Sequence, residues 1–140
     1  MKRIIAIDYG DARTGVAVSD LTGSLVGEAL TIQEWNPERL AQRIAFFARE
    51  RDAGTLVLGL PKNMDGTEGP RAEKARAFCA LLEKETDLPV VLWDERRSTI
   101  EAHDILHAVG KREKKHRATV DAVAASLLLE SYLGSPAAKG

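Results

Sequence analysis

The sequence has almost no cysteine, few aromatic residues and no long apolar segment. Its 140 residues include one cysteine, Cys79, and aromatic residues make up only 5%. A single cysteine excludes an internal disulfide and indicates a reducing compartment, and a small core hydrophobe on a helix is its expected role. The apolar runs are too short to cross a membrane, and no signal-peptide core precedes the first polar break. We therefore expect a cytoplasmic location and no membrane partner.

An excess of positive charge is also missing. The 20 Lys and Arg residues are balanced by 21 Asp and Glu residues, which gives a net charge of −1. A protein that binds nucleic acid with its whole surface is usually basic, so any such binding must come from a local basic patch. The length and the hydrophobic content of 44% predict one domain, residues 1–134, followed by a disordered tail at 135–140.

The segment Ile4–Gly10 organises the rest of the chain. Four apolar residues run directly into Asp8, and Gly10 follows two places later. Such a run is typical of a strand buried on both faces of a sheet, and α/β folds place ligand sites where such strands end. Asp8 is therefore either a site residue or the start of an Asp-x-Gly turn, and the segment alone favours neither.

The order of elements predicts an α/β fold. Two further strands, 15–20 and 25–32, follow by short links and must be antiparallel neighbours, whereas strands 55–60 and 89–93 each follow a helix and must be parallel to a neighbour. The helices are predicted from Asn36-Pro37 to Gly54, at 71–85, from the capping box at Ser98 to about 108, and at 118–133. This gives a five-stranded mixed sheet with Ile4–Asp8 in its middle and helices on both faces.

Further carboxylates follow the last predicted strand and lie in the last predicted helix. Asp94-Glu95 leave that strand at what should be the edge where Asp8 lies. Asp121 shares a helix face with Ala124, Ala125 and Leu128, so it points inward and needs a partner there. An acid near a helix start also complements the dipole, but that explains an exposed acid and not one among Ala and Leu.

Carboxylates without thiolate or histidine company are typical ligands of Mg²⁺ or Mn²⁺. A zinc site is not indicated, because no further ligands accompany the histidines. We interpret His103, His107 and His116 as surface residues. Hard cations of this kind are used mainly in phosphoryl transfer. Five of the seven residues 111–117 are basic, which is either a solvated face or a surface that grips phosphate. These are Lys111, Arg112, Lys114, Lys115 and Arg117, and Arg96, Arg97 and Arg13 complete the predicted nucleic-acid-binding set.

Four groups of motifs follow one another along the chain. They are Asp8-Tyr9-Gly10 with Arg13-Thr14-Gly15, Gly59-Leu60-Pro61 with Asn63, Asp65-Gly66 and Gly69, Asp94-Glu95-Arg96 with Ser98-Thr99 and Glu101-Ala102, and Val120-Asp121 with Ala124-Ala125. Together they resemble the YqgF/RuvX family, and they occur in the order expected for it from Ile4 to Leu133.

That family is similar in fold to ribonuclease H and the RuvC resolvase, so the resemblance implies an RNase H-like fold. It also implies a catalytic and metal-binding trio at Asp8, Glu95 and Asp121. Family members are described as nucleases that trim the 5′ end of precursor 16S ribosomal RNA, and as candidate Holliday junction resolvases. The expected partner is therefore structured RNA or branched DNA, and the protein a monomer or homodimer. Ribonuclease H relatives usually have four acids, and Asp94 and Asp11 are both possible as the fourth.

Two readings from other classes remain open. Asp8-Tyr9-Gly10 through Gly15 also fits the phosphate loop of actin and hexokinase relatives, which would make the chain a nucleotide-binding ATPase module. Those proteins close two such domains around the nucleotide, and they do not require Glu95 and Asp121. The other alternative is an RNA-binding module without catalysis.

Overall fold

The computed structural model describes residues 2–97 and 117–139. Five strands form one sheet in the order β3-β2-β1-β4-β5. The strands are β1 (Arg3–Asp8), β2 (Arg13–Ser19), β3 (Val26–Gln33), β4 (Ala53–Leu60) and β5 (Val90–Asp94). The pairs β1–β2 and β2–β3 are antiparallel, whereas β1–β4 and β4–β5 are parallel. The predicted mixed sheet is confirmed, and β1 is its middle strand.

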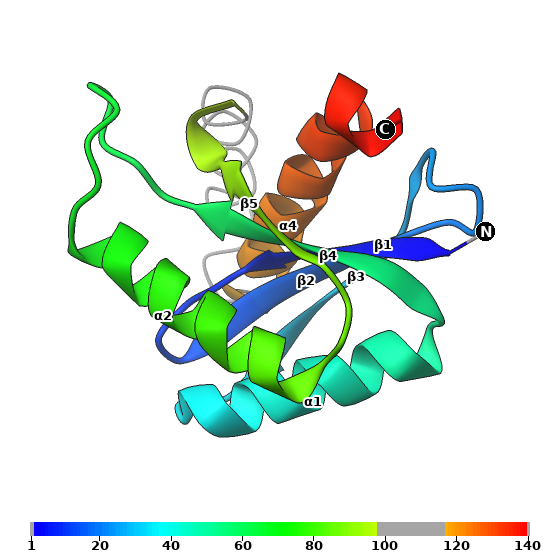
Figure 1. Cartoon of the computed structure of the whole chain (residues 1–140), viewed down its shortest axis with the longest axis horizontal. Helices are drawn as coiled ribbons and strands as arrows, with labels where there is room; N and C mark the ends of the chain where they lie inside the picture. The colour runs from blue at the N-terminus through cyan, green and yellow to red at the C-terminus, as the bar shows by residue number, and fades with distance from the viewer. Residues whose placement is uncertain (1, 98–116, 140) are drawn as a thin grey trace.

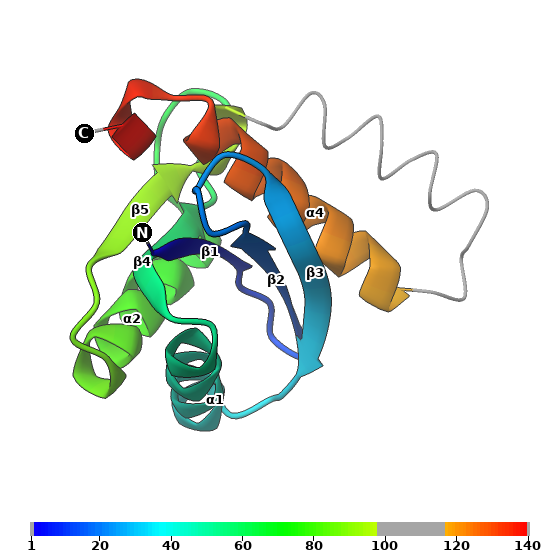
Figure 2. The same ribbon diagram turned by 90° about the vertical axis from the view of Figure 1, so that its right-hand side faces the viewer.

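Helices cover both faces of the sheet, as predicted. Helices α1 (Pro37–Glu50) and α2 (Pro70–Glu85) lie on one face, and α4 (Arg117–Leu133) crosses the other (Figures 1 and 2). The predicted start of α1 is confirmed, because the Asn36 side chain accepts a hydrogen bond of 3.1 Å from the Arg39 backbone N–H and Pro37 is the first helical residue. A 3-10 turn, η1 (Glu95–Arg97), directly follows β5.

Alternation along β1 divides the core into two parts. Ile5 and Ile7 pack with α1 and α2 in one cluster, whereas Ala6 packs with Ala125 and Leu128 of α4 in the other. Residue 8 follows the same alternation, so Asp8 lies on the α4 side. The small Ala6 and Ala17 on this face allow α4 to lie close over the middle of the sheet. Cys79 is buried in α2 and packs in the first cluster, as expected of a core residue.

The C-terminal residues differ from the expected tail. Pro136–Lys139 form a second 3-10 helix, η2, Ser135 is buried, and Ala138 packs against the α4 cluster. The Ser135 hydroxyl donates a 2.6 Å hydrogen bond to the Tyr132 carbonyl oxygen, so the polar group that suggested a loop is satisfied locally. The structure thus gives residues 136–139 a 3-10 helix where the sequence suggests a disordered tail.

Most other predicted boundaries shift by one or two residues, with the third strand at Val26–Gln33 and the last helix beginning at Arg117. The predicted end of the first helix at Gly54 is wrong, because α1 ends at Glu50, the chain turns through Asp52 at a φ of 54°, and β4 begins at Ala53. The helix predicted from Ser98 and the three histidines lie outside the described residues. Among the described helices, none is long and apolar enough to cross a membrane.

Candidate functional site

Asp8 ends the central strand with a glycine on each side of it. In the antiparallel ladder Asp8 pairs with Gly15 of β2. In the parallel ladder Ile7 pairs with Leu58, which puts Gly59 of β4 beside Asp8 on the other flank. With no side chain on either neighbour, other groups can approach the sheet closely on both flanks of Asp8.

Gly59 makes room for the carboxyl group of Glu95. A Cβ atom on Gly59 would overlap Oε1 of Glu95, so the Glu95 side chain folds back from η1 over the end of β4. A hydrogen bond joins the carboxyl groups of Glu95 and Asp8. The structure thus brings together two of the three predicted acids, from segments 87 positions apart in the sequence.

Burial raises the pKa of both carboxyl groups. For Asp8, desolvation is the largest cause, and the hydrogen bond to Glu95 and the charge of Arg71 oppose it. For Glu95, desolvation and then repulsion by Asp8 raise the pKa to about 8. The pair therefore retains one proton at neutral pH, which Glu95 holds and donates to Asp8.

This proton predicts a stability difference that depends on pH. The unfolded chain releases the Glu95 proton near the ordinary value of 4.5, whereas the folded chain keeps it up to about 8. The folded state binds more protons between these values, so the free energy of unfolding falls as the pH rises through that window. Glu95→Gln cannot lose this proton, so its free energy of unfolding should rise relative to that of the parent as the pH increases from 4.5 to about 8. Urea unfolding in EDTA across this range measures the difference; a constant offset would contradict the shared proton.

Asp121 reaches the same edge from α4. A Cβ atom on Gly15 would overlap the backbone carbonyl oxygen of Asp121, so the helix backbone lies directly on the residue that pairs with Asp8. The Asp121 carboxylate forms an ion pair of 3.5 Å with Nε of Arg13. Asp121 is thus next to the Asp8–Glu95 pair in the fold, with its charge directed at Arg13.

The donor set of the Asp8–Glu95 pair fits a hard cation. Two desolvated carboxyl groups that share a proton provide oxygen ligands for Mg²⁺ or Mn²⁺, and Mg²⁺ in proteins is commonly held by one or two carboxylates with water and phosphate completing its shell. In residues 2–97 and 117–139, no three Asp, Glu, His or Cys side chains are grouped closely enough to hold a metal ion together. The arrangement therefore supplies a two-carboxylate site, with Asp121 beside it.

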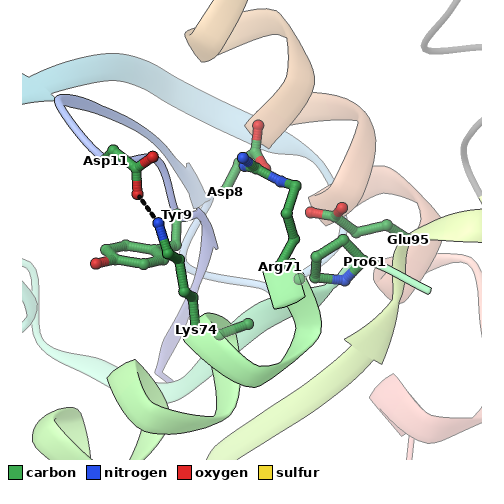
Figure 3. A pocket seen from close by; sticks show the side chains of 9 residues that line it. Asp8, Tyr9, Asp11, Pro61, Arg71, Lys74 and Glu95 are labelled. Carbon is green, nitrogen blue, oxygen red and sulfur yellow. Dashed lines mark hydrogen bonds and ion pairs between the residues drawn. The ribbon is translucent and has the colours of Figure 1, made fainter. Parts of the chain in front are cut away.

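A small cavity opens at the carboxyl pair and has a basic wall that the sequence did not reveal. It measures about 20 Å³, room for one water molecule or small ion, and Arg71 and Lys74 of α2 line it together with Tyr9 and Asp11. Figure 3 shows the Arg71 side chain rising from α2 toward Asp8 and Glu95. The only sequence signal was an arginine in the first turn of a helix that begins at the exit of a parallel strand.

Both acids considered as a fourth ligand are engaged with cations. Asp94 accepts hydrogen bonds from the guanidinium of Arg96, the shortest 2.7 Å, and Asp11 pairs with Lys74 at 3.2 Å. Arg96 also donates to the carbonyl oxygen of Met64, so it ties the loop after β4 to the end of β5. The structure does not describe the other predicted contacts to nucleic acid. Lys111, Arg112, Lys114 and Lys115 lie outside the described residues, and so do the side chains of Arg97 and Arg117.

A family described as "RuvX: Holliday junction resolvase" matches residues 2–135. The chain belongs to this family. A relative from Halothermothrix orenii is 43% identical over 131 residues, with 94% of each chain covered, and is named "Putative pre-16S rRNA nuclease". A relative of the same name from Geobacillus sp. (strain WCH70) is 42% identical over 135 residues, 95% of this chain and 98% of that protein.

Solved structures of RuvC-type nucleases confirm that this chain has an RNase H-like fold. Thermus thermophilus RuvC in complex with a Holliday junction substrate superposes with a TM-score of 0.61 at 12% identity, with 98% of each chain covered. The large terminase nuclease of the thermophilic phage G20c gives a TM-score of 0.58 at 11% identity over 95% of this chain and 82% of that chain. At such identities the likeness concerns the fold alone.

Proposed function

We propose that this RuvX family member is a nuclease that hydrolyses phosphodiester bonds in structured nucleic acid. The observation that carries the proposal is the Asp8–Glu95 carboxyl pair, desolvated at the end of the central strand in a fold shared with nucleases. A nucleotide-binding ATPase module has no need of Glu95 and Asp121 beside Asp8, and an RNA-binding module has no need of a buried acid pair. Hydrolysis makes use of all of these features.

Asp8 and Glu95 are the proposed metal ligands, with Asp121 as the third acid of the site. When bound, Mg²⁺ or Mn²⁺ supplies the positive charge that polarises the phosphodiester and activates the attacking water. Asp8 and Glu95 must first release their shared proton, since only ionised carboxylates bind a hard cation well. Asp121 is the residue whose charge can turn from Arg13 to the site. No side chain acts as a nucleophile in this scheme.

The proposed substrate is the 5′ end of precursor 16S ribosomal RNA. The names of the curated relatives support it, since they match along nearly the whole chain. The description of the family favours a second candidate, a four-way DNA junction. Either substrate presents phosphates at high density. The five Lys and Arg residues among 111–117, together with Arg13, Arg96 and Arg97, would bind these phosphates through their charge.

One assay with three substrates tests this function. Purified protein is incubated in Mg²⁺ or Mn²⁺ with a precursor 16S RNA fragment, with a four-way DNA junction and with ATP. We expect cleavage of the RNA at a defined position that EDTA abolishes, and no ATP turnover. Cleavage of the junction alone would favour resolvase activity, and ATP hydrolysis without cleavage of nucleic acid would overturn the proposal.

A further inference from the structure

Arg71 occupies a position that the stability of its helix does not explain. α2 begins at Pro70 after the Gly69 N-cap, which makes no side-chain capping bond, and Arg71 is therefore in the first turn. The N-terminus of a helix carries partial positive charge, so acidic residues are favoured there and a cation is unfavourable. A basic residue at this position calls for a negatively charged neighbour outside the helix.

The guanidinium of Arg71 differs from its basic neighbours on α2, which form ion pairs. Arg76 binds both carboxylate oxygens of Glu68 at 2.6 and 2.8 Å, and Lys74 binds Asp11 at 3.2 Å. Within residues 2–97 and 117–139, no hydrogen bond or ion pair engages the Arg71 side chain. Its five N–H donors remain available, and its side chain is exposed.

Arg71 nevertheless faces the site. It lines the cavity together with Asp8, Glu95 and Gly59, and in Figure 3 its side chain extends from α2 toward the two carboxyl groups. Its charge acts on both of them, since it favours the ionised form of Asp8 and of Glu95. An anion at the mouth of this cavity would meet carboxylates on one side and the guanidinium on the other.

We infer that Arg71 binds a non-bridging oxygen of the scissile phosphate and holds it over the Asp8–Glu95 pair. The inference rests on the proposed nuclease function and adds to it a residue that contacts the substrate. Two carboxylates alone repel a phosphodiester, and a guanidinium opposes this repulsion with a planar pair of donors that matches phosphate geometry.

Arg71 takes no part in the proton balance of the reaction. Hydrolysis forms a phosphorus–oxygen bond from water and breaks the bond to the leaving oxygen, and the proton lost by the water is balanced by one that the leaving oxygen takes up. The guanidinium keeps its protons throughout and stabilises the negative charge that develops on the non-bridging oxygen. It is therefore a group for binding and charge stabilisation.

Three variants test the inference. They are Arg71→Ala, Arg71→Lys and the matched control Arg49→Ala. Arg49 is an exposed arginine in the last turn of α1, on the other helix of the same layer, so its loss changes net charge equally. On the nucleic acid that the parent cleaves, Arg71→Ala should lower kcat/KM by about 10²-fold, because one preorganised donor group is lost from the transition state. Arg71→Lys should recover part of this loss, and Arg49→Ala should have the parent's rate.

Two further measurements separate phosphate binding from a structural role. Each non-bridging oxygen at the mapped cleavage site is replaced in turn by sulfur, and one of the two replacements should slow the parent but slow Arg71→Ala much less, since the contact is already absent. Binding of the same oligonucleotide in EDTA should show a salt slope lower by about one in Arg71→Ala. All four proteins should unfold in one cooperative transition at similar melting temperatures, because an exposed charge near a helix end changes stability only slightly.

The outcomes distinguish the inference from the function on which it rests. If the parent cleaves and Arg71→Ala cleaves equally fast, or if both sulfur effects persist unchanged in Arg71→Ala, then Arg71 does not hold the scissile phosphate. A parent that cleaves neither RNA nor junction in any metal overturns the nuclease function, and the inference with it.

Discussion

Asp8→Asn is expected to lower cleavage by about 10³-fold or more while leaving the protein as stable as the parent or more stable. Asparagine has nearly the same shape, but it cannot ionise and is a poor ligand for a hard cation, so the site loses its central carboxylate. Burial already raises the pKa of Asp8, which means that its charge opposes folding at neutral pH. The neutral amide removes that penalty. Cleavage assays in Mg²⁺ and thermal unfolding in EDTA measure the two effects.

Asp87→Asn is the matched control for this variant. Asp87 is exposed in the turn between α2 and β5, at the opposite end of the parallel strands from the site. Mg²⁺ or Mn²⁺ should raise the melting temperature of the parent and of Asp87→Asn, but change that of Asp8→Asn little, because a ligand stabilises only a protein that binds it. Cleavage by Asp8→Asn at the parent rate would remove Asp8 from the site, and loss of the fold would favour a structural role for this acid.

The sheet was predictable from the sequence because its signals are local. The lengths of the connections decide between antiparallel and parallel pairing, and the uninterrupted apolar run ending at Asp8 indicates the most buried strand. The C-terminal residues carry no such local signal. Gly134, Ser135 and Pro136 are breakers in composition, yet the chain turns there so that Ala138 packs against the α4 cluster. Long-range packing of this kind has no periodic signature in a short segment.

The site was predictable only in part, for a related reason. Asp8 and Glu95 follow strand ends, and the parallel topology brings strand ends to one edge, so their meeting could be expected. Arg71 arrives from the face of α1 and α2, and which residue of a helix start reaches across the edge depends on the angle of that helix. The direction of the Asp121 carboxylate toward Arg13 likewise depends on side-chain geometry that spacing does not determine.

The close approach of α4 to Gly15 leads to the second large effect, which concerns Gly15→Ala. A methyl group here would overlap the carbonyl oxygen of Asp121 and press against Cβ of Ala125, so the backbone of α4 would have to move away from β2. Overpacking of this kind lowers the free energy of unfolding by about 1–3 kcal/mol, and rigid backbone on the far side of the contact favours the upper end. The same displacement would carry Asp121 away from Asp8, so cleavage should fall by about 10²-fold even at temperatures where the variant is folded.

Gly27→Ala separates this displacement from the general effect of replacing a strand glycine. Gly27 lies in β3, and a Cβ atom there would meet its nearest neighbours at 3.5 Å or more, which is ordinary contact. Alanine should be neutral or slightly stabilising at that position, because it restricts the unfolded chain without strain. Urea unfolding and cleavage assays on both variants provide the comparison. If Gly15→Ala were as stable and as active as Gly27→Ala, α4 would not need its close contact with β2, and the position of Asp121 beside Asp8 would not depend on Gly15.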